Sequence, residues 1–137
     1  MKNEIINKLE RLREYVKILS SYKKCTPQQI KKDVILRGAI ERYLQISLEC
    51  CIDIGEMIIS YEGLRKPETY KEIMEILGEK GIIPKKFAKE FAEAIKFRNL
   101  LVHMYERIEV ERLCNYLKNN LEDFNKFAKF IANYLKK

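Results

Sequence analysis

The chain has 137 residues, which is enough for one domain with a hydrophobic core of its own. Hydrophobic residues make up 47% and charged residues 34%, and only five glycines and three prolines are present, which excludes long disordered tracts. The formal net charge of +7 is compatible with a polyanionic partner such as nucleic acid, and equally with a lysine-rich surface that serves solubility alone.

Residues 1–20 carry charges throughout, so we expect no signal peptide. No apolar run reaches the roughly 18 residues that span a bilayer, so we expect a cytoplasmic protein with no membrane contact. The four cysteines form no CxxC pair, and a single histidine does not complete a usual zinc site. We therefore expect no metal site and reduced, mostly buried thiols at Cys25, Cys50, Cys51 and Cys114.

Two helices are predicted in the N-terminal half. Apolar residues at steps of three and four predict the first from about Asn3 to Ser21. The run Thr26-Pro27-Gln28-Gln29 combines an N-cap, a proline and a capping-box glutamine, and predicts a second helix that runs to about Tyr61 and ends near Gly63. The second half of this long helix is apolar on more than one face. We therefore expect it to pack against its own domain and against a second copy of the chain.

Three further helices are predicted in the C-terminal half. A short one covers about Glu68 to Leu77, and Pro84 opens a fourth that packs through apolar residues up to Leu101. The last begins soon after Tyr105 and runs to the chain end. No strand pattern appears. The sequence therefore predicts a single all-α domain over residues 1–137, an up-and-down bundle of four to five helices with a long second helix.

The end of the fourth predicted helix carries the chemistry of interest, in the run Arg98-Asn99-Leu100-Leu101-Val102-His103-Met104-Tyr105. His103 is the only histidine, and imidazole transfers protons readily near neutral pH. Arg98 is a permanent cation. Together they suit phosphodiester chemistry, in which a cation stabilises the developing phosphorane charge and an imidazole moves the proton. The competing interpretation is that His103 only packs in the core or caps the helix.

Spacing sets the geometry of this run. On one continuous helix, Arg98 and His103 point about 140° apart, so they meet most easily at a helix end or across a two-fold dimer. His103 and Tyr105 share a side only on extended backbone. We therefore expect the helix to end close to His103 and Tyr105 to lie on exposed backbone.

Acidic residues cluster on the long second helix. Between residues 38 and 63 one arginine stands against five acids, a balance of −4, which leaves +11 for the rest of the chain. Glu49, Asp53 and Glu56 recur at i, i+4 and i+7 and share one face. Two interpretations remain open. This face is either a narrow solvent-exposed side, or it places a carboxylate, with Asp53 as first choice, against the arginine or histidine of the motif.

The pattern of Arg98, His103 and Tyr105 resembles the signature of the HEPN superfamily of all-helical ribonucleases, and in particular the HepT toxins of HepT–MntA toxin–antitoxin pairs. Phe97-Arg98-Asn99 and Leu101-Val102-His103 also match that family, whereas Met104 departs from its usual acidic residue before the tyrosine. The resemblance covers nearly the whole chain, because length and helix order fit as well.

The resemblance implies a metal-independent endoribonuclease toxin that works as a homodimer, with two motifs in one composite cleft and no cofactor. The ribose 2′-OH would attack the adjacent phosphate, with His103 as general base or acid and Arg98 on the phosphate. Asn99 would bind the phosphate or cap the helix. The products would be a 2′,3′-cyclic phosphate and a 5′-OH, so DNA would be inert.

The resemblance also implies a partner, an MntA-like nucleotidyltransferase antitoxin that uses ATP to transfer AMP to Tyr105. The added adenylate would block RNA by bulk and by negative charge. Two alternatives remain open at this point: a non-catalytic helical partner of a nucleotidyltransferase, and a HEPN-type domain that binds RNA or a nucleotide without cutting it.

Overall fold

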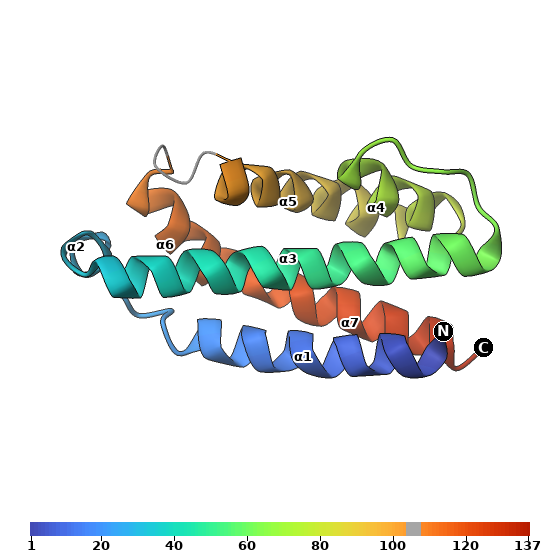
Figure 1. The fold of residues 1–137 in the computed structure, drawn as a ribbon, viewed down its shortest axis with the longest axis horizontal. Coiled ribbons are helices and arrows are strands. Elements are labelled where there is room, and N and C mark those ends of the chain that lie inside the picture. The colour runs from blue at the N-terminus through green and yellow to red at the C-terminus, as the bar shows by residue number, and fades with distance from the viewer. Residues whose placement is uncertain (104–107) are drawn as a thin grey trace.

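The computed structural model of the chain describes residues 1–103 and 108–137, which form an elongated bundle of α-helices without a strand in those residues. The helix α3 (Val34–Glu62) runs the length of the bundle, with α1 (Lys2–Ser20) and α7 (Leu121–Leu135) on one side and the α4–α5 hairpin on the other (Figure 1). The two termini lie together at one end. The predicted all-α, up-and-down architecture with a long helix is confirmed.

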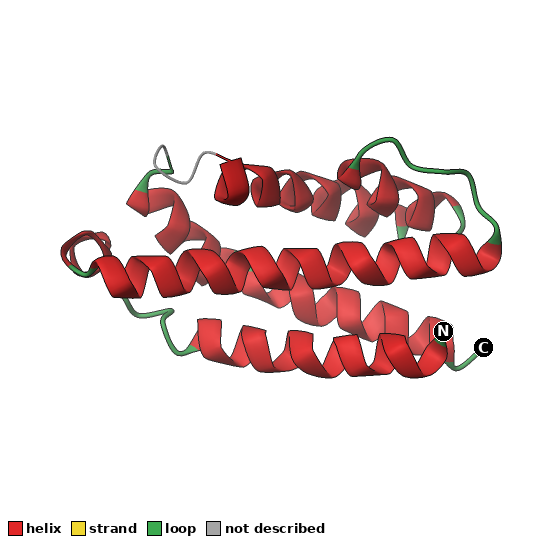
Figure 2. Ribbon diagram, viewed as in Figure 1, coloured by secondary structure: helices red, strands yellow, loops and turns green. Residues whose placement is uncertain are grey.

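Most of the predicted helix boundaries agree with the structure. The first helix, the short helix α4 (Tyr70–Glu79) and the helix α5 (Lys85–His103) lie where the sequence placed them. The α3 helix ends at Gly63, whose φ of 65° and ψ of 34° place it in the left-handed region that favours glycine. Loops are short apart from the segment between α3 and α4, as Figure 2 shows.

The prediction of one uninterrupted second helix was wrong at a single residue. A short helix α2 (Pro27–Lys32) opens with the predicted capping box at Thr26, and Asp33 then breaks the run with φ −122° and ψ 95°. The Asp33 carboxylate accepts hydrogen bonds from the backbone N–H groups of Ile35 and Leu36, at 3.1 and 3.0 Å, and so caps α3 anew. An aspartate that bonds its own backbone in this way favours a helix start over a helix interior.

The last predicted helix is also divided. It consists of α6 (Val110–Asn119) and α7, which meet at Asn120 with φ −117° and ψ −6°. Apolar residues continue through the break, because Leu117 and Leu121 are both buried. The hydrophobic spacing therefore concealed a turn at two consecutive asparagines, a residue type that competes with the helical backbone for hydrogen bonds.

The core surrounds α3, and this corrects one inference from the sequence. Apolar residues on several faces of α3 predicted burial against a second copy. In the structure, the chain's own α1, α4, α5 and α7 pack around α3 and bury most of these side chains, among them Leu44, Leu48, Cys51, Ile54 and Ile58. The mixed apolar faces of α3 are therefore no argument for a dimer.

The thiols behave as predicted. All four cysteines are free, three of them buried and Cys25 half-buried. Burial raises the pKa of Cys50 to about 11, so its thiol is protonated at neutral pH. In the part of the chain that the structure describes, no helix combines the length and the apolar character needed to cross a membrane.

Candidate phosphate site at the end of α5

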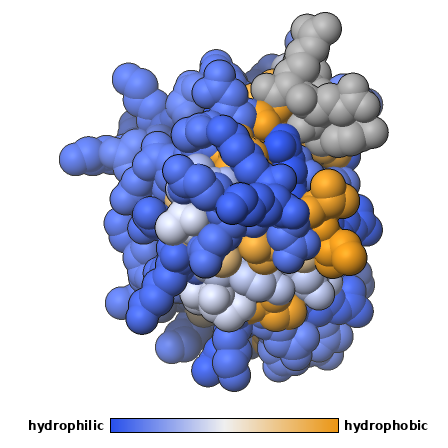
Figure 3. All heavy atoms as spheres, turned by 90° about the vertical axis from the view of Figure 1, so that its left-hand side faces the viewer, coloured by the Kyte–Doolittle hydropathy of each residue, from blue (hydrophilic) through white to orange (hydrophobic). Residues whose placement is uncertain are grey.

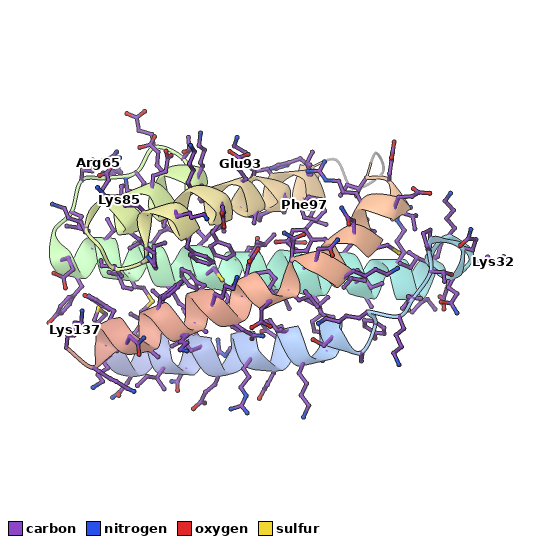
Figure 4. The ribbon with its side chains drawn as sticks, turned by 180° about the vertical axis from the view of Figure 1, so that it is seen from behind. Lys32, Arg65, Lys85, Glu93, Phe97 and Lys137 are labelled. Atoms are coloured by element: carbon purple, nitrogen blue, oxygen red, sulfur yellow. The ribbon has the colours of Figure 1, made fainter. Side chains whose placement is uncertain are left out.

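The C-terminal half of α5 is fixed to the bundle by an aromatic stack. Phe97 is 2% exposed, and its ring stacks on Tyr116 of α6 at a centroid distance of 5.1 Å. The guanidinium of Arg112 lies 4.9 Å from the Phe97 ring centroid. Figure 4 labels Phe97 on the side of α5 turned toward the rest of the bundle. The next residue, Arg98, therefore projects from a rigid helix rather than from a loop.

Arg98 is held by α3. Its Nε and Nη2 both donate to one oxygen of Glu49, at 3.0 and 2.8 Å, and its Nη1 donates to Oδ1 of Asn99 at 3.3 Å. The Arg98 side chain is 18% exposed. Nε and Nη2 lie on the side edge of the planar guanidinium, whereas Nη1 and Nη2 form its end edge. Glu49 therefore fixes the orientation of Arg98 through the side edge.

Two N–H donors of this guanidinium remain available for an anion. Arginine carries five N–H donors, and the contacts within residues 1–103 and 108–137 use three of them. Guanidinium N–H groups form strong hydrogen bonds to the oxygens of a phosphate or carboxylate. The arrangement combines an orienting carboxylate with two unused donors, which suits recognition of a planar or tetrahedral oxyanion.

The acidic face on α3 was predicted correctly, but its contact residue was not. Asp53 was the first choice in the interpretation that sets a carboxylate against the motif, yet its carboxylate lies 3.3 Å from the Lys8 ammonium of α1, and half of its side chain is exposed. Glu49, one turn earlier, makes the contact with Arg98. Gln45, one turn before that, donates to the same Glu49 oxygen at 3.4 Å. Which acidic residue contacts α5 depends on how α3 is positioned along α5, to within one helical turn. The spacing of residues within α3 alone does not predict that position.

Asn99 and His103 lie beyond Arg98 on the outer surface of α5. Both are exposed, and a separation of four residues puts them on one helix face. The helix α5 is described up to His103, and the next four residues lie outside the described residues, so the predicted helix end close to His103 stays a prediction. The exposure of His103 contradicts the interpretation that it packs in the core. Asn99 and His103 thus share an exposed polar face of α5, and Asn99 accepts a hydrogen bond from the half-buried Arg98 beside it.

Tyr105 lies outside the described residues, so its predicted place on exposed backbone stays a prediction. The chain is described again from Ile108, which is buried. The Arg37 Nη2 of α3 donates to the Ile108 carbonyl oxygen at 2.6 Å. This bond ties the backbone three residues after Tyr105 to the start of α3.

A second aromatic residue, Tyr70, accompanies Arg98, and the sequence analysis missed it. The Cζ atom of Arg98 lies 5.1 Å from the Tyr70 ring centroid, within the range of a cation–π contact. Tyr70 comes from the first turn of α4, and no motif or spacing links it to the end of α5. Only the antiparallel packing of α4 on α5 brings the two together.

No group of three or more His, Cys, Asp and Glu in residues 1–103 and 108–137 is arranged to hold a metal ion.

Comparisons with known proteins agree with this geometry. A family profile described as ribonuclease HepT-like matches residues 5–131. An mRNA nuclease HepT of Shewanella oneidensis is 25% identical over 131 residues, which cover 96% of this chain and 98% of that protein. A putative RNase of Archaeoglobus fulgidus is 28% identical over 129 residues, which cover 94% and 93% of the two chains.

The fold is shared with solved structures as well. A tri-AMPylated Shewanella oneidensis HEPN toxin, solved in complex with an MNT antitoxin, matches with a TM-score of 0.87 at 25% identity. The match covers 97% of this chain and 99% of the toxin. Since the family profile spans nearly the whole chain and the fold agrees over the same length, the protein belongs to the family of HepT-like ribonucleases.

Proposed function

We propose that the protein is a metal-independent endoribonuclease toxin whose site is the polar surface of Arg98, Asn99 and His103. The observation that carries this proposal is the Arg98 guanidinium, which Glu49 orients and of whose five N–H donors two have no partner in the described residues. Family membership and the exposed imidazole five residues later support it.

The mechanism assigns one task to each group. Arg98 binds the scissile phosphate and stabilises the charge that grows on it in the transition state. The ribose 2′-oxygen forms a bond to phosphorus, and its proton passes to a base. The bond from phosphorus to the 5′-oxygen then breaks, and that oxygen takes up a proton. His103 performs one of these proton transfers as general base or general acid. Asn99 hydrogen-bonds Arg98 and helps to hold the phosphate.

The functional unit in this proposal is a homodimer with one composite cleft. Arg98 and His103 leave the continuous helix α5 about 140° apart, so a second copy is needed to turn both groups toward one phosphate. Val34 and Ile35, at the start of α3, are 81% and 83% exposed in the single chain. Figure 3 looks onto this end of the bundle and shows a small group of hydrophobic side chains on a mostly hydrophilic face. Exposed apolar side chains of this size favour contact with another protein surface.

A mixing experiment tests the composite cleft. Arg98→Ala and His103→Ala chains with different affinity tags are co-expressed, and the mixed dimer is purified through both tags. Neither variant alone is expected to cut RNA, whereas the mixed dimer regains activity because one intact arginine and one intact histidine come from different copies. A mixed dimer as inactive as its parents would contradict the composite cleft and would leave both groups to a single chain.

The proposed partner is an MntA-like nucleotidyltransferase that neutralises the nuclease by AMPylation of Tyr105 with ATP. A solved relative is described as tri-AMPylated and bound to an MNT antitoxin, which supports this assignment. The bond between Arg37 and Ile108 ties the backbone near Tyr105 to the same end of the bundle as the motif. An adenylate at this place would add bulk and negative charge beside Arg98.

Co-expression tests the modification. Wild-type chain co-expressed with the antitoxin is expected to gain the mass of one or more adenylates and to lose nuclease activity, whereas Tyr105→Phe stays unmodified and active. If the antitoxin neutralises Tyr105→Phe, and this variant still cuts RNA on its own, AMPylation of Tyr105 is not the mechanism.

The chemistry of the proposed reaction is tested by the substrate and by the product ends. Purified protein in EDTA is incubated with an RNA oligonucleotide and with a copy in which every 2′-OH is replaced by hydrogen. We expect cleavage of the RNA alone, with 2′,3′-cyclic phosphate and 5′-OH ends identified by mass spectrometry. Cleavage of the deoxy copy, or activity that EDTA abolishes, would contradict attack by the 2′-OH without a metal.

A further inference from the structure

Tyr70 occupies an unusual place for a large aromatic side chain. It is 39% exposed, and Tyr61 is the one other exposed aromatic side chain in residues 1–103 and 108–137. The Arg98 guanidinium covers part of its ring, at 5.1 Å from Cζ to the ring centroid. An aromatic ring beside a phosphate-binding arginine is the combination that proteins use to bind single-stranded nucleic acid.

The helix that carries Tyr70 is rigidly placed. Thr69 caps α4, since its hydroxyl oxygen accepts a hydrogen bond from the Glu72 backbone N–H at 3.2 Å. On the inner side, α4 packs so closely on α3 that a Cβ atom added at Gly55 would lie 2.3 Å from the Ile73 side chain. Tyr70 therefore stands at a fixed position relative to Arg98, and little conformational entropy is lost when a ligand stacks on its ring.

Position along the α4–α5 hairpin tells which part of the substrate reaches Tyr70. Tyr70 begins α4, and the packing of α4 on α5 sets its ring beside Arg98, close to the end of α5. The nucleotide whose phosphate binds Arg98 therefore has a partly exposed aromatic ring beside it.

From this juxtaposition we infer that Tyr70 is a nucleobase subsite, on which a base next to the scissile phosphate stacks. The inference rests on the proposed ribonuclease function and adds a recognition element to it. Stacking on a single ring accepts any base, so Tyr70 selects unpaired RNA without reading its sequence. The phosphate on Arg98 and the base on Tyr70 then hold one nucleotide at two points.

The test uses an oligonucleotide with one ribonucleotide among deoxynucleotides, because such a substrate is cut at one position and so has one register. Two further substrates carry an abasic residue on either side of that position. Wild type is expected to show about tenfold higher KM for one of the two abasic substrates, a loss typical of one stacked base. Tyr70→Leu is expected to show about tenfold higher KM for the intact substrate and no further loss when the base is removed.

Control variants separate stacking from a purely structural role. Tyr70→Phe keeps the ring and is expected to behave as wild type. Tyr61→Leu removes a tyrosine that is 67% exposed at the far end of α3, and is expected to change nothing. If Tyr70 only supports Arg98, Tyr70→Leu lowers kcat and keeps the abasic penalty, which overturns the subsite.

Two remaining outcomes are distinguishable. If wild type cuts all three substrates with equal KM, no base is bound and the subsite is overturned, while the ribonuclease function stands. If wild type cuts neither these substrates nor ordinary RNA, the ribonuclease function is overturned and the subsite with it.

Discussion

Arg65 and Arg98 are both held by glutamates, and the number of carboxylates that each one meets separates their roles. Arg65, in the loop between α3 and α4, donates through Nη1 to Glu72 at 2.9 Å and through Nη2 to Glu79 at 3.0 Å. Arg98 instead gives Nε and Nη2 to a single oxygen of Glu49. Arg65 is thus shared between two carboxylates, whereas Arg98 meets one carboxylate and has the neutral amide of Asn99 at its third nitrogen.

Their surroundings sharpen the contrast. The Arg65 side chain is 51% exposed, and Figure 4 labels it on the outer loop, at the opposite end of the bundle from Lys32. Arg98 is 18% exposed and lies between Glu49, Asn99 and the ring of Tyr70. A partly desolvated cation with fixed orientation binds phosphate more strongly than a solvated one. The same residue type is thus a surface clamp in one place and, in the proposed function, an anion site in the other.

The largest expected effect comes from exchange of each arginine for lysine. Arg98→Lys keeps the charge and loses the planar fork, so we expect kcat for RNA cleavage to fall on the order of a thousandfold. Arg65→Lys, the matched control, is expected to leave kcat unchanged and to lower Tm slightly. Steady-state kinetics and thermal unfolding of both variants measure these effects. Equal loss of activity in the two variants would remove the distinction between clamp and anion site.

A smaller effect is expected at Glu49, which acts through Arg98. Glu49→Gln keeps one oxygen acceptor and removes the charge, so kcat is expected to fall about tenfold while KM does not rise, because the site becomes more positive. Glu49→Ala is expected to be worse than Glu49→Gln.

Asp53→Asn is the matched control for Glu49, one turn along the same face of α3 and paired with Lys8 instead. It is expected to leave both kcat and KM as in wild type. A larger loss for Asp53→Asn than for Glu49→Gln would show that the orienting carboxylate has been assigned to the wrong helical turn.

The smallest expected effect is a pH dependence of the stability that the ion pair of Arg65 and Glu79 contributes. The hydrogen bond from Arg65 is the main cause that lowers the pKa of Glu79 below its ordinary value. Because this pKa is lower in the folded than in the unfolded chain, the pair stabilises the fold above the ordinary glutamate pKa. That contribution is lost as the pH falls through the lowered value.

The Tm difference between wild type and Glu79→Gln is therefore expected to be small at about pH 7, since the pair is exposed, and to disappear as the pH falls through the lowered pKa of Glu79. Thermal unfolding followed by circular dichroism at neutral pH and across the acid range measures it. A difference that stays constant with pH would mean that Glu79 acts through packing.

The sequence predicted those features that depend on neighbours along the chain. Helix periodicity located α1, α4 and α5, the capping box at Thr26 located the start of α2, and the motif located the polar end of α5. The sequence did not predict the helix breaks at Asp33 and Asn120, and the reason is the same for both. The apolar spacing continued through each break and outweighed the turn preference of single polar residues.

The site itself was predicted only in part. Arg98, Asn99 and His103 follow from a short motif, but their supporting contacts depend on how helices far apart in sequence are set against each other. The acidic face of α3 was visible, yet the rotation and shift of α3 against α5 select Glu49 rather than Asp53. Tyr70 and Arg37 gave no sequence signal, because each acts across a helix–helix contact.

The most direct test of the central claim is the rate of RNA cleavage in EDTA by three purified proteins: wild type, Arg98→Ala and His103→Ala. We predict that wild type cuts RNA to 2′,3′-cyclic phosphate ends, and that both variants fold with wild-type Tm and show no cleavage above background. Cleavage by either variant at the wild-type rate would contradict the assignment of this surface as the active site.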